Sequence, residues 1–170
     1  MKRALSLLFV AACSSEAATS APAPSGVITA LAPDVSEVAC AVDDDARDLE
    51  EHACLHATSG PFAEVVATVP ASAPAISRPH TAYRVDIRGD ERWVSFQAQD
   101  AGTHVFFSTP PARLAIRRAD GAAVAPSCEG AVSDVCVELE HQVQASFGAR
   151  ETVYVAVFGD TPTKLVVEHL

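Results

Sequence analysis

Histidine is the metal-binding side chain that stands out in this sequence. Of the six histidines, His52 and His56 flank Cys54 in a His-x-Cys-x-His step. Residues four apart lie on the same face of a helix, so both imidazoles would point the same way if this segment is helical. Three imidazoles with one open coordination position suit Zn²⁺ or Cu²⁺.

Other histidines lie on or beside predicted strands, where folding could bring them to that helix. His80 opens a predicted strand, His104 lies within one, and His141 precedes another. We name His56, His80 and His141 as the candidate ligands of a Zn²⁺ or Cu²⁺ site. The alternative is that these are ordinary surface or half-buried histidines, because their spacing matches no defined metal motif.

Other chemistry finds less support in the sequence. The acidic run from Asp43 to Glu51 could bind Ca²⁺, but it lacks the alternating acids and the central glycine of an EF-hand loop, which favours a solvated helix start. Hydrolase, metalloprotease and phosphate-loop motifs are absent from the sequence, so we predict no enzyme. Trp93, Tyr83 and Tyr154 could stack on sugar rings if exposed, although large aromatics on strands are usually core residues.

The cysteines indicate an exported protein. The sequence has five cysteines. If the first, Cys13, is assigned to lipid, an even set remains: Cys40, Cys54, Cys128 and Cys136. An even set in an exported chain predicts two disulfides, with three possible connectivities. We favour the local pairs Cys40 with Cys54 and Cys128 with Cys136, because each closes a short loop around a polar turn.

The N-terminus has the features of a secretory signal. Lys2 and Arg3 precede a short apolar run that is too brief to cross a bilayer, which needs about 20 residues. The run ends in Val10-Ala11-Ala12-Cys13, which resembles the lipobox of bacterial lipoproteins. That resemblance implies cleavage after residue 12, a diacylglyceryl group on the Cys13 thiol, a further acyl chain on its amine, and stable anchoring to a membrane. Ser14 after the cysteine resembles lipoproteins sorted to an outer membrane; the alternative is an ordinary signal peptide cleaved near residues 19–21.

The remaining chain divides into a tether and one domain. Residues 13–39 are rich in Ala, Ser, Pro and Thr and predict a flexible tether, whereas residues 40–170 predict a folded domain. Acids at its start, an i, i+4 pair of Arg47 and Glu51, and Gly60-Pro61 after it predict a helix near 43–57. Alternating apolar residues then predict strands over 64–69, 82–88, 92–97, 103–108, 112–118, 134–139, 142–147, 152–158 and 164–168.

Short strands separated by turn residues favour an all-β fold, a two-sheet antiparallel β-sandwich of jelly-roll type with one short N-terminal helix. One such turn is Arg88-Gly89-Asp90, which also matches the integrin tripeptide. The expected core residues are apolar positions of the strands: Tyr83, Val85, Ile87, Trp93 or Val94, Phe96, Val105 or Phe106, Leu114, Ile116, Val153, Val155, Val157, Leu165 and Val167.

Two resemblances follow from these segments. Val94-Ser95-Phe96, Asp100-Ala101-Gly102-Thr103, Asp120-Gly121 and Val153-Tyr154-Val155-Ala156-Val157 resemble the bacterial pre-peptidase C-terminal domain, a β-sandwich appended to secreted enzymes. That likeness implies a role in secretion, folding or adhesion. Cys54-Leu55-His56, Gly60-Pro61 and His80-Thr81-Ala82-Tyr83 resemble small uncharacterised bacterial lipoproteins, which implies no particular activity.

Charge limits the partners. The chain carries a formal charge of −10, which becomes −12 when Lys2 and Arg3 leave with the signal. So acidic a body argues against nucleic acid and anionic lipid head groups as partners. We therefore expect a lipid-anchored protein of the bacterial cell envelope, whose sandwich binds an unknown envelope protein or carbohydrate, or alternatively binds Zn²⁺ or Cu²⁺ through histidines.

Overall fold

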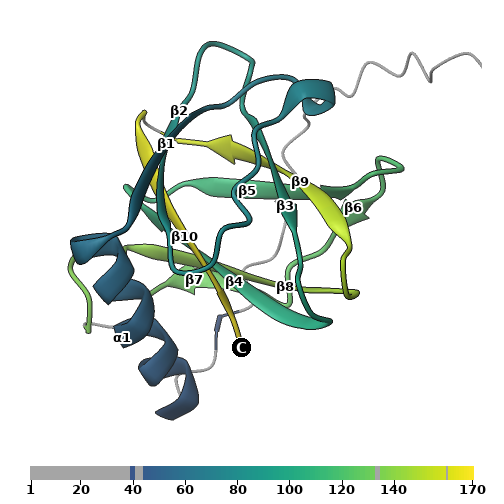
Figure 1. Ribbon diagram of the computed structural model, residues 1–170. Coiled ribbons are helices and arrows are strands. Elements are labelled where there is room, and N and C mark those ends of the chain that lie inside the picture. The colour runs from purple at the N-terminus through teal and green to yellow at the C-terminus, as the bar shows by residue number, and fades with distance from the viewer. Residues whose placement is uncertain (1–38, 41–43, 133–134, 160) are drawn as a thin grey trace, which may run out of the picture. The chain divides into compact units, whose positions relative to one another are not determined.

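The structure is a computed structural model that describes residues 39–40, 44–132, 135–159 and 161–170. The predicted signal peptide, Cys13 and nearly all of the predicted tether lie outside these residues. The described chain forms one helix, α1 (Asp44–Ser59), one short 3-10 turn, η1 (Pro70–Ser72), and two β-sheets (Figure 1). Among these described elements, no helix combines the length and the apolar character needed to cross a bilayer.

The larger sheet has six strands and the smaller has four. In spatial order, the first contains β1 (Phe62–Val66), β2 (Ala82–Asp86), β10 (Thr163–His169), β4 (Gly102–Thr109), β8 (His141–Phe147) and β7 (Cys128–Ala131). The second contains β3 (Trp93–Gln97), β9 (Thr152–Phe158), β5 (Arg113–Arg118) and β6 (Ala123–Val124). The predicted all-β sandwich with one helix is confirmed.

The pair of β1 and β2 is parallel, whereas every other pair within the sheets is antiparallel. After β1 the chain crosses to the edge of the smaller sheet, where Thr68 bridges Trp93 and Ala75 bridges Ser95. It then returns to the larger sheet at Ala82. Because this connection passes over the other sheet instead of turning back as a hairpin, β2 runs in the same direction as β1.

The main core lies between the two sheets and contains most of the expected residues. Tyr83, Val85, Val94, Phe96, Phe106, Leu114, Ile116, Val153, Val155, Val157 and Leu165 are buried there, with Ile87 and Val167 packed against it. At two positions the sequence left a choice between adjacent residues, Trp93 or Val94 and Val105 or Phe106. The other residue of each pair is also buried, but outside this core: Trp93 is 5% exposed, and Val105 is fully buried.

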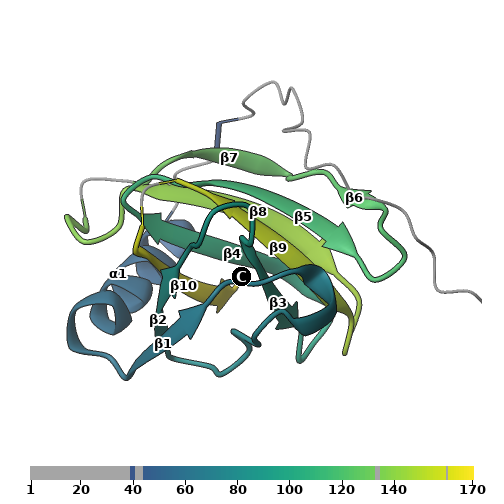
Figure 2. The same cartoon turned by 90° about the horizontal axis from the view of Figure 1, so that it is seen from above.

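A second, smaller core joins α1 to the outer face of the larger sheet. Ala53 and Ala57 of the helix pack with Val105, Phe107 and Val166 of β4 and β10. Figures 1 and 2 show the helix lying against this sheet, away from the four-stranded one. Strand β4 is therefore covered on both faces, which explains its uninterrupted apolar run.

The helix has the predicted location and runs two residues further than predicted. Asp44 and Asp45 lie in its first turn, where anions favour the positive end of the helix dipole. Gly60 ends it with a φ of 79°, and its backbone N–H donates to the His56 carbonyl. The predicted Arg47–Glu51 pair forms at 3.9 Å between exposed side chains.

Some predicted details are wrong. Residues 135–140 form turns instead of the predicted strand 134–139, because Cys136 and Leu139 are committed to the small core beside the helix. Two short strands, β6 and β7, were not predicted. The turn at Arg88-Gly89-Asp90 is confirmed, with the Glu91 N–H donating to the Arg88 carbonyl.

The four expected cysteines form two disulfides, but the favoured local pairing is wrong. Cys40 pairs with Cys128, 88 residues away, and Cys54 pairs with Cys136, 82 residues away. Each bridge therefore ties the region of the helix to the β7–β8 end of the larger sheet. Short loops around polar turns indicated local pairs, but packing of α1 on the sheet decides which thiols meet.

Candidate metal centre

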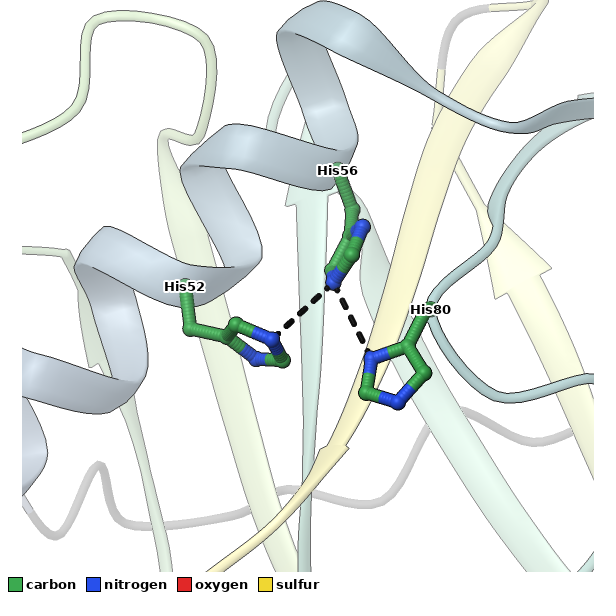
Figure 3. Close-up of side chains that lie close together, drawn as sticks. All are labelled: His52, His56 and His80. Atoms are coloured by element: carbon green, nitrogen blue, oxygen red, sulfur yellow. Dashed lines mark hydrogen bonds between the residues drawn. The ribbon is translucent and has the colours of Figure 1, made fainter.

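The two helical histidines of the His-x-Cys-x-His step lie on one face of α1, as their spacing predicts. Figure 3 shows both imidazoles directed away from the helix toward the same point. His56 is 8% exposed, whereas the His52 side chain is 42% exposed. Their Nε2 atoms are 3.2 Å apart.

The third imidazole comes from the turn before β2. His80 has a φ of 54°, a left-handed conformation that is uncommon in residues other than glycine and costs of order 1 kcal/mol. Its Nδ1 lies 3.1 Å from His56 Nε2 (Figure 3). One nitrogen from each of the three rings lies within 4.8 Å of the other two. We call His52, His56 and His80 the histidine triad.

The outward-facing nitrogens of the helical pair have acceptors that determine their tautomers. His52 Nδ1 lies 3.2 Å from Glu168 Oε2, and His56 Nδ1 lies 3.4 Å from the Gly60 carbonyl. Both partners are acceptors only, so in neutral rings both Nδ1 atoms carry the proton. The two Nε2 atoms then present lone pairs to each other at 3.2 Å, an arrangement that a shared proton or a metal ion between them would stabilise.

Glu168 on β10 is the carboxylate of this site. It is 8% exposed, and its Oε1 is buried without a hydrogen-bond partner among the described residues. This Oε1 lies 4.0 Å from His56 Nε2, while Oε2 holds His52. A carboxylate behind a ligating histidine is a recurrent feature of zinc sites, because it orients the ring and strengthens the ligand.

The two nitrogen contacts of His56 Nε2 have lengths compatible with a shared transition-metal ion. With metal–nitrogen bonds of about 2.05 Å, ligand atoms of a tetrahedral site lie about 3.3 Å apart, against about 2.9 Å for neighbours in a square-planar site. The contacts of 3.2 and 3.1 Å that His56 Nε2 makes lie between these two values, within about 0.2 Å of the tetrahedral one. The arrangement could therefore hold Zn²⁺ with one coordination position left open.

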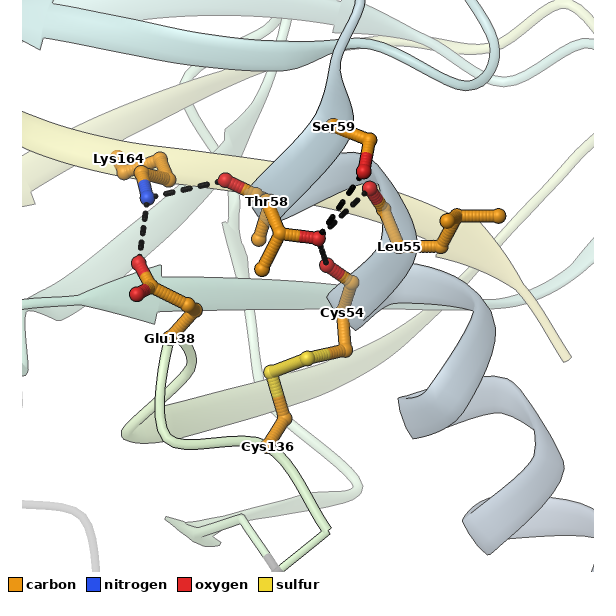
Figure 4. Close-up of a disulfide and its surroundings, with 8 residues drawn as sticks. Cys54, Leu55, Thr58, Ser59, Cys136, Glu138 and Lys164 are labelled. Atoms are coloured by element: carbon orange, nitrogen blue, oxygen red, sulfur yellow. Dashed lines mark hydrogen bonds and ion pairs between the residues drawn. A yellow bond between two sulfur atoms is a disulfide. The ribbon is translucent and has the colours of Figure 1, made fainter.

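The helix that carries His52 and His56 is also fixed by contacts on another side. Cys54, between the two histidines in sequence, is joined to Cys136 (Figure 4). At the end of the helix, Lys164 of β10 donates to the Ala57 carbonyl and contacts Glu138 Oε2, both at 3.0 Å. These bonds hold α1 against the sheet, so His52 and His56 are placed by a rigid element.

Of the three histidines named from the sequence, the structure brings His56 and His80 together and leaves His141 apart. His141 lies at the start of β8, with Nε2 3.4 Å from Glu129 Oε1 on β7. His52 takes the third place instead. The signal for it was present in the sequence, because the four-residue spacing of His52 and His56 already predicted one shared face.

A second histidine pair lies at the end of the sandwich. His104 of β4 is buried against Phe96 and Phe147, and its ring centroid is 4.7 Å from that of His169. Burial, with a smaller contribution from the charge of His169, lowers the pKa of His104 below its ordinary value of 6.5. A neutral imidazole is therefore expected there at pH 7.

The residues considered for other ligands are placed as follows. Trp93 and Tyr83 are buried, so neither offers a ring face to a sugar, and Tyr154 is half-buried. Asp43 of the acidic run lies outside the described residues.

No protein-family model matches the chain, and a comparison with curated proteins finds no match. The resemblances to lipoproteins and to the pre-peptidase C-terminal domain therefore stay predictions, and function has to be argued from the site itself.

Proposed function

We propose that this protein binds one divalent transition-metal ion, such as Zn²⁺, through His52 Nε2, His56 Nε2 and His80 Nδ1. The observation that carries the proposal is the facing pair of Nε2 atoms, whose opposite nitrogens are held by Glu168 and the Gly60 carbonyl. Two lone pairs at that distance repel each other unless a proton or a metal ion lies between them, and a metal ion would satisfy all three nitrogens at once. The left-handed backbone of His80 supports the same conclusion, because strain persists where a site requires it.

We further propose that the metal is held outside the cytoplasm by a lipid-anchored domain. The two disulfides use four of the five cysteines, which leaves Cys13 for lipidation. Disulfides are typical of exported proteins, and the lipobox-like Val10-Ala11-Ala12-Cys13 supports anchoring to the envelope, with the outer membrane favoured by Ser14. In this proposal, the unknown envelope partner of the sandwich exchanges or uses the bound metal.

The proposal is tested by isothermal titration of the oxidised protein with Zn²⁺ and Cu²⁺. We expect one equivalent of Zn²⁺ to bind with a dissociation constant below 1 µM, in the range usual for multi-histidine sites. His52→Gln should weaken binding by more than tenfold, because it removes one of three ligands. His141→Gln is the matched control and should leave the affinity unchanged, since His141 contacts Glu129 and not the triad.

Two results would contradict the proposal. One is the absence of Zn²⁺ binding tighter than micromolar in a protein that circular dichroism shows to be folded. The other is an equal loss of affinity in the His52 and His141 variants, which would mean that the metal binds elsewhere or that the substitutions act through the fold.

A further inference from the structure

The triad borders a pocket with a volume of about 440 Å³. His52, His80 and Glu168 line this pocket, whereas His56 does not. The buried His56 therefore lies behind the other two histidines as seen from the pocket, and the exposed His52 and His80 face the pocket. A metal held by the three nitrogens would be reached by other molecules from this side.

The open coordination position is the chemical reason to consider a ligand there. Structural zinc sites are closed by four protein ligands, whereas three protein ligands leave a position for water or a small molecule. The triad provides three nitrogens, and no fourth metal-binding group joins them within 4.8 Å among the described residues. Glu168 Oε2 is occupied by His52 Nδ1, and Glu168 Oε1 lies 4.0 Å from His56 Nε2 without joining the group of nitrogens.

The size and lining of the pocket fit an organic molecule. Small-molecule sites measure about 300–1,000 Å³ and are predominantly apolar with a few polar groups. Ile76, Phe96 and Val167 contribute apolar surface here. A ligand that extends from the metal would place an apolar body against these side chains, with hydrophobic burial adding to its affinity.

The charges around the pocket determine which polar group a ligand can carry. A divalent ion bound by three neutral imidazoles keeps its positive charge, and the cationic side chain of Arg78 also lines the pocket. Both favour an anion. Asp100 and Glu168 line the pocket too, so a second negative charge on the ligand would meet a carboxylate.

We infer that the pocket binds a small organic monoanion, a carboxylate with an aromatic or branched apolar body, whose carboxylate oxygen takes the open position on the metal. This inference rests on the proposed metal site. In this inference the metal ion binds the ligand directly, and the protein does not only carry the ion.

The test uses the zinc-loaded, oxidised protein and three probes in isothermal titration. Benzoate carries both the head group and an apolar body, acetate carries only the head group, and benzamide keeps the body without the charge. We expect benzoate to bind at least tenfold more tightly than either of the other two, because only benzoate uses both parts of the pocket. Metal-free protein should bind benzoate at least tenfold more weakly.

Arg78→Gln tests the second contribution to anion binding. It should weaken benzoate several-fold and leave the Zn²⁺ affinity unchanged, because Arg78 is exposed and is not a ligand. Arg84→Gln is the matched control, an exposed arginine paired with Glu64 outside the pocket. A loss of the same size in both variants would contradict a role for the pocket.

The outcomes separate this inference from the proposed function. Tight Zn²⁺ binding with benzoate no tighter than acetate overturns the ligand site and leaves the metal site standing. Absence of Zn²⁺ binding overturns both. Benzoate binding that is equal with and without metal overturns the open-position assignment.

Discussion

Substitution of Glu168 by glutamine should weaken metal binding without unfolding the protein. Glu168 Oε2 lies 3.2 Å from His52 Nδ1 and is the acceptor that turns His52 Nε2 toward the metal. Removing such an outer-shell carboxylate typically costs 10–100-fold in metal affinity, or about 1.4–2.7 kcal/mol. Because the glutamine carbonyl can still accept from His52, we expect a loss near tenfold.

The effect on the metal-free protein should be small. Glu168 is 8% exposed with one oxygen unpartnered, so the neutral amide relieves a desolvated charge while keeping the shape of the side chain. The amide N–H can also turn toward the lone pair of His56 Nε2, 4.0 Å from the present Oε1. We expect the free energy of unfolding at pH 8 to change by less than about 1 kcal/mol.

Two measurements on the same variant check these expectations. Competition with a chromophoric chelator gives the dissociation constant for Zn²⁺, and urea unfolding in EDTA, followed by circular dichroism, gives the stability. Glu129→Gln is the matched control, because this half-buried carboxylate pairs with His141 in the same way but away from the triad. An unchanged dissociation constant in Glu168→Gln, or the same change in both variants, would refute the reasoning.

Three further predictions concern the fold. The free energy of unfolding should fall as the pH drops below 6.5 toward the lowered pKa of His104, because the unfolded chain binds the proton first. In urea melts, the free energy of unfolding should differ less between pH 7.5 and pH 5.5 for His104→Phe than for the unsubstituted protein. Replacing Cys54 and Cys136 by serine should cost about 2–4 kcal/mol in chemical unfolding and raise the Zn²⁺ dissociation constant; unchanged values would contradict the role of this bridge in fixing the helix. Gly102→Ala should lower the melting temperature by several degrees in thermal unfolding, because its φ is 151° and a Cβ would collide with His169 Nε2; an unchanged value would mean that His169 moves freely.

Much of the fold follows from local patterns. Alternating apolar residues identified most strands and more than half of the main core, because one side chain in two faces the partner sheet, as in Val153, Val155 and Val157. The helix followed from its charges, its i, i+4 pair and Gly60. Such signals are contained within a few consecutive residues.

The features that could not be predicted depend on which distant segments meet. The crossing between β1 and β2 depends on bridges such as Thr68 with Trp93, for which the sequence has no short-range marker. The disulfides join residues more than 80 positions apart, because α1 packs over the larger sheet.

The same limit applied to part of the proposed metal site. His56 and His80 were named from the sequence, but excluding His141 required knowing which strand ends face the helix. His52 lies on the helix itself, so its position relative to His56 was already determined by the helical repeat. His141 begins β8, whose start lies beside β7 and Glu129.

The central claim is most directly tested by anomalous diffraction at the zinc edge from crystals grown with one equivalent of Zn²⁺. The account predicts one strong peak about 2 Å from His52 Nε2, His56 Nε2 and His80 Nδ1, with a fourth ligand on the pocket side. A peak beside His141 and Glu129, or its absence from the triad in crystals of folded protein that contain zinc, would contradict it.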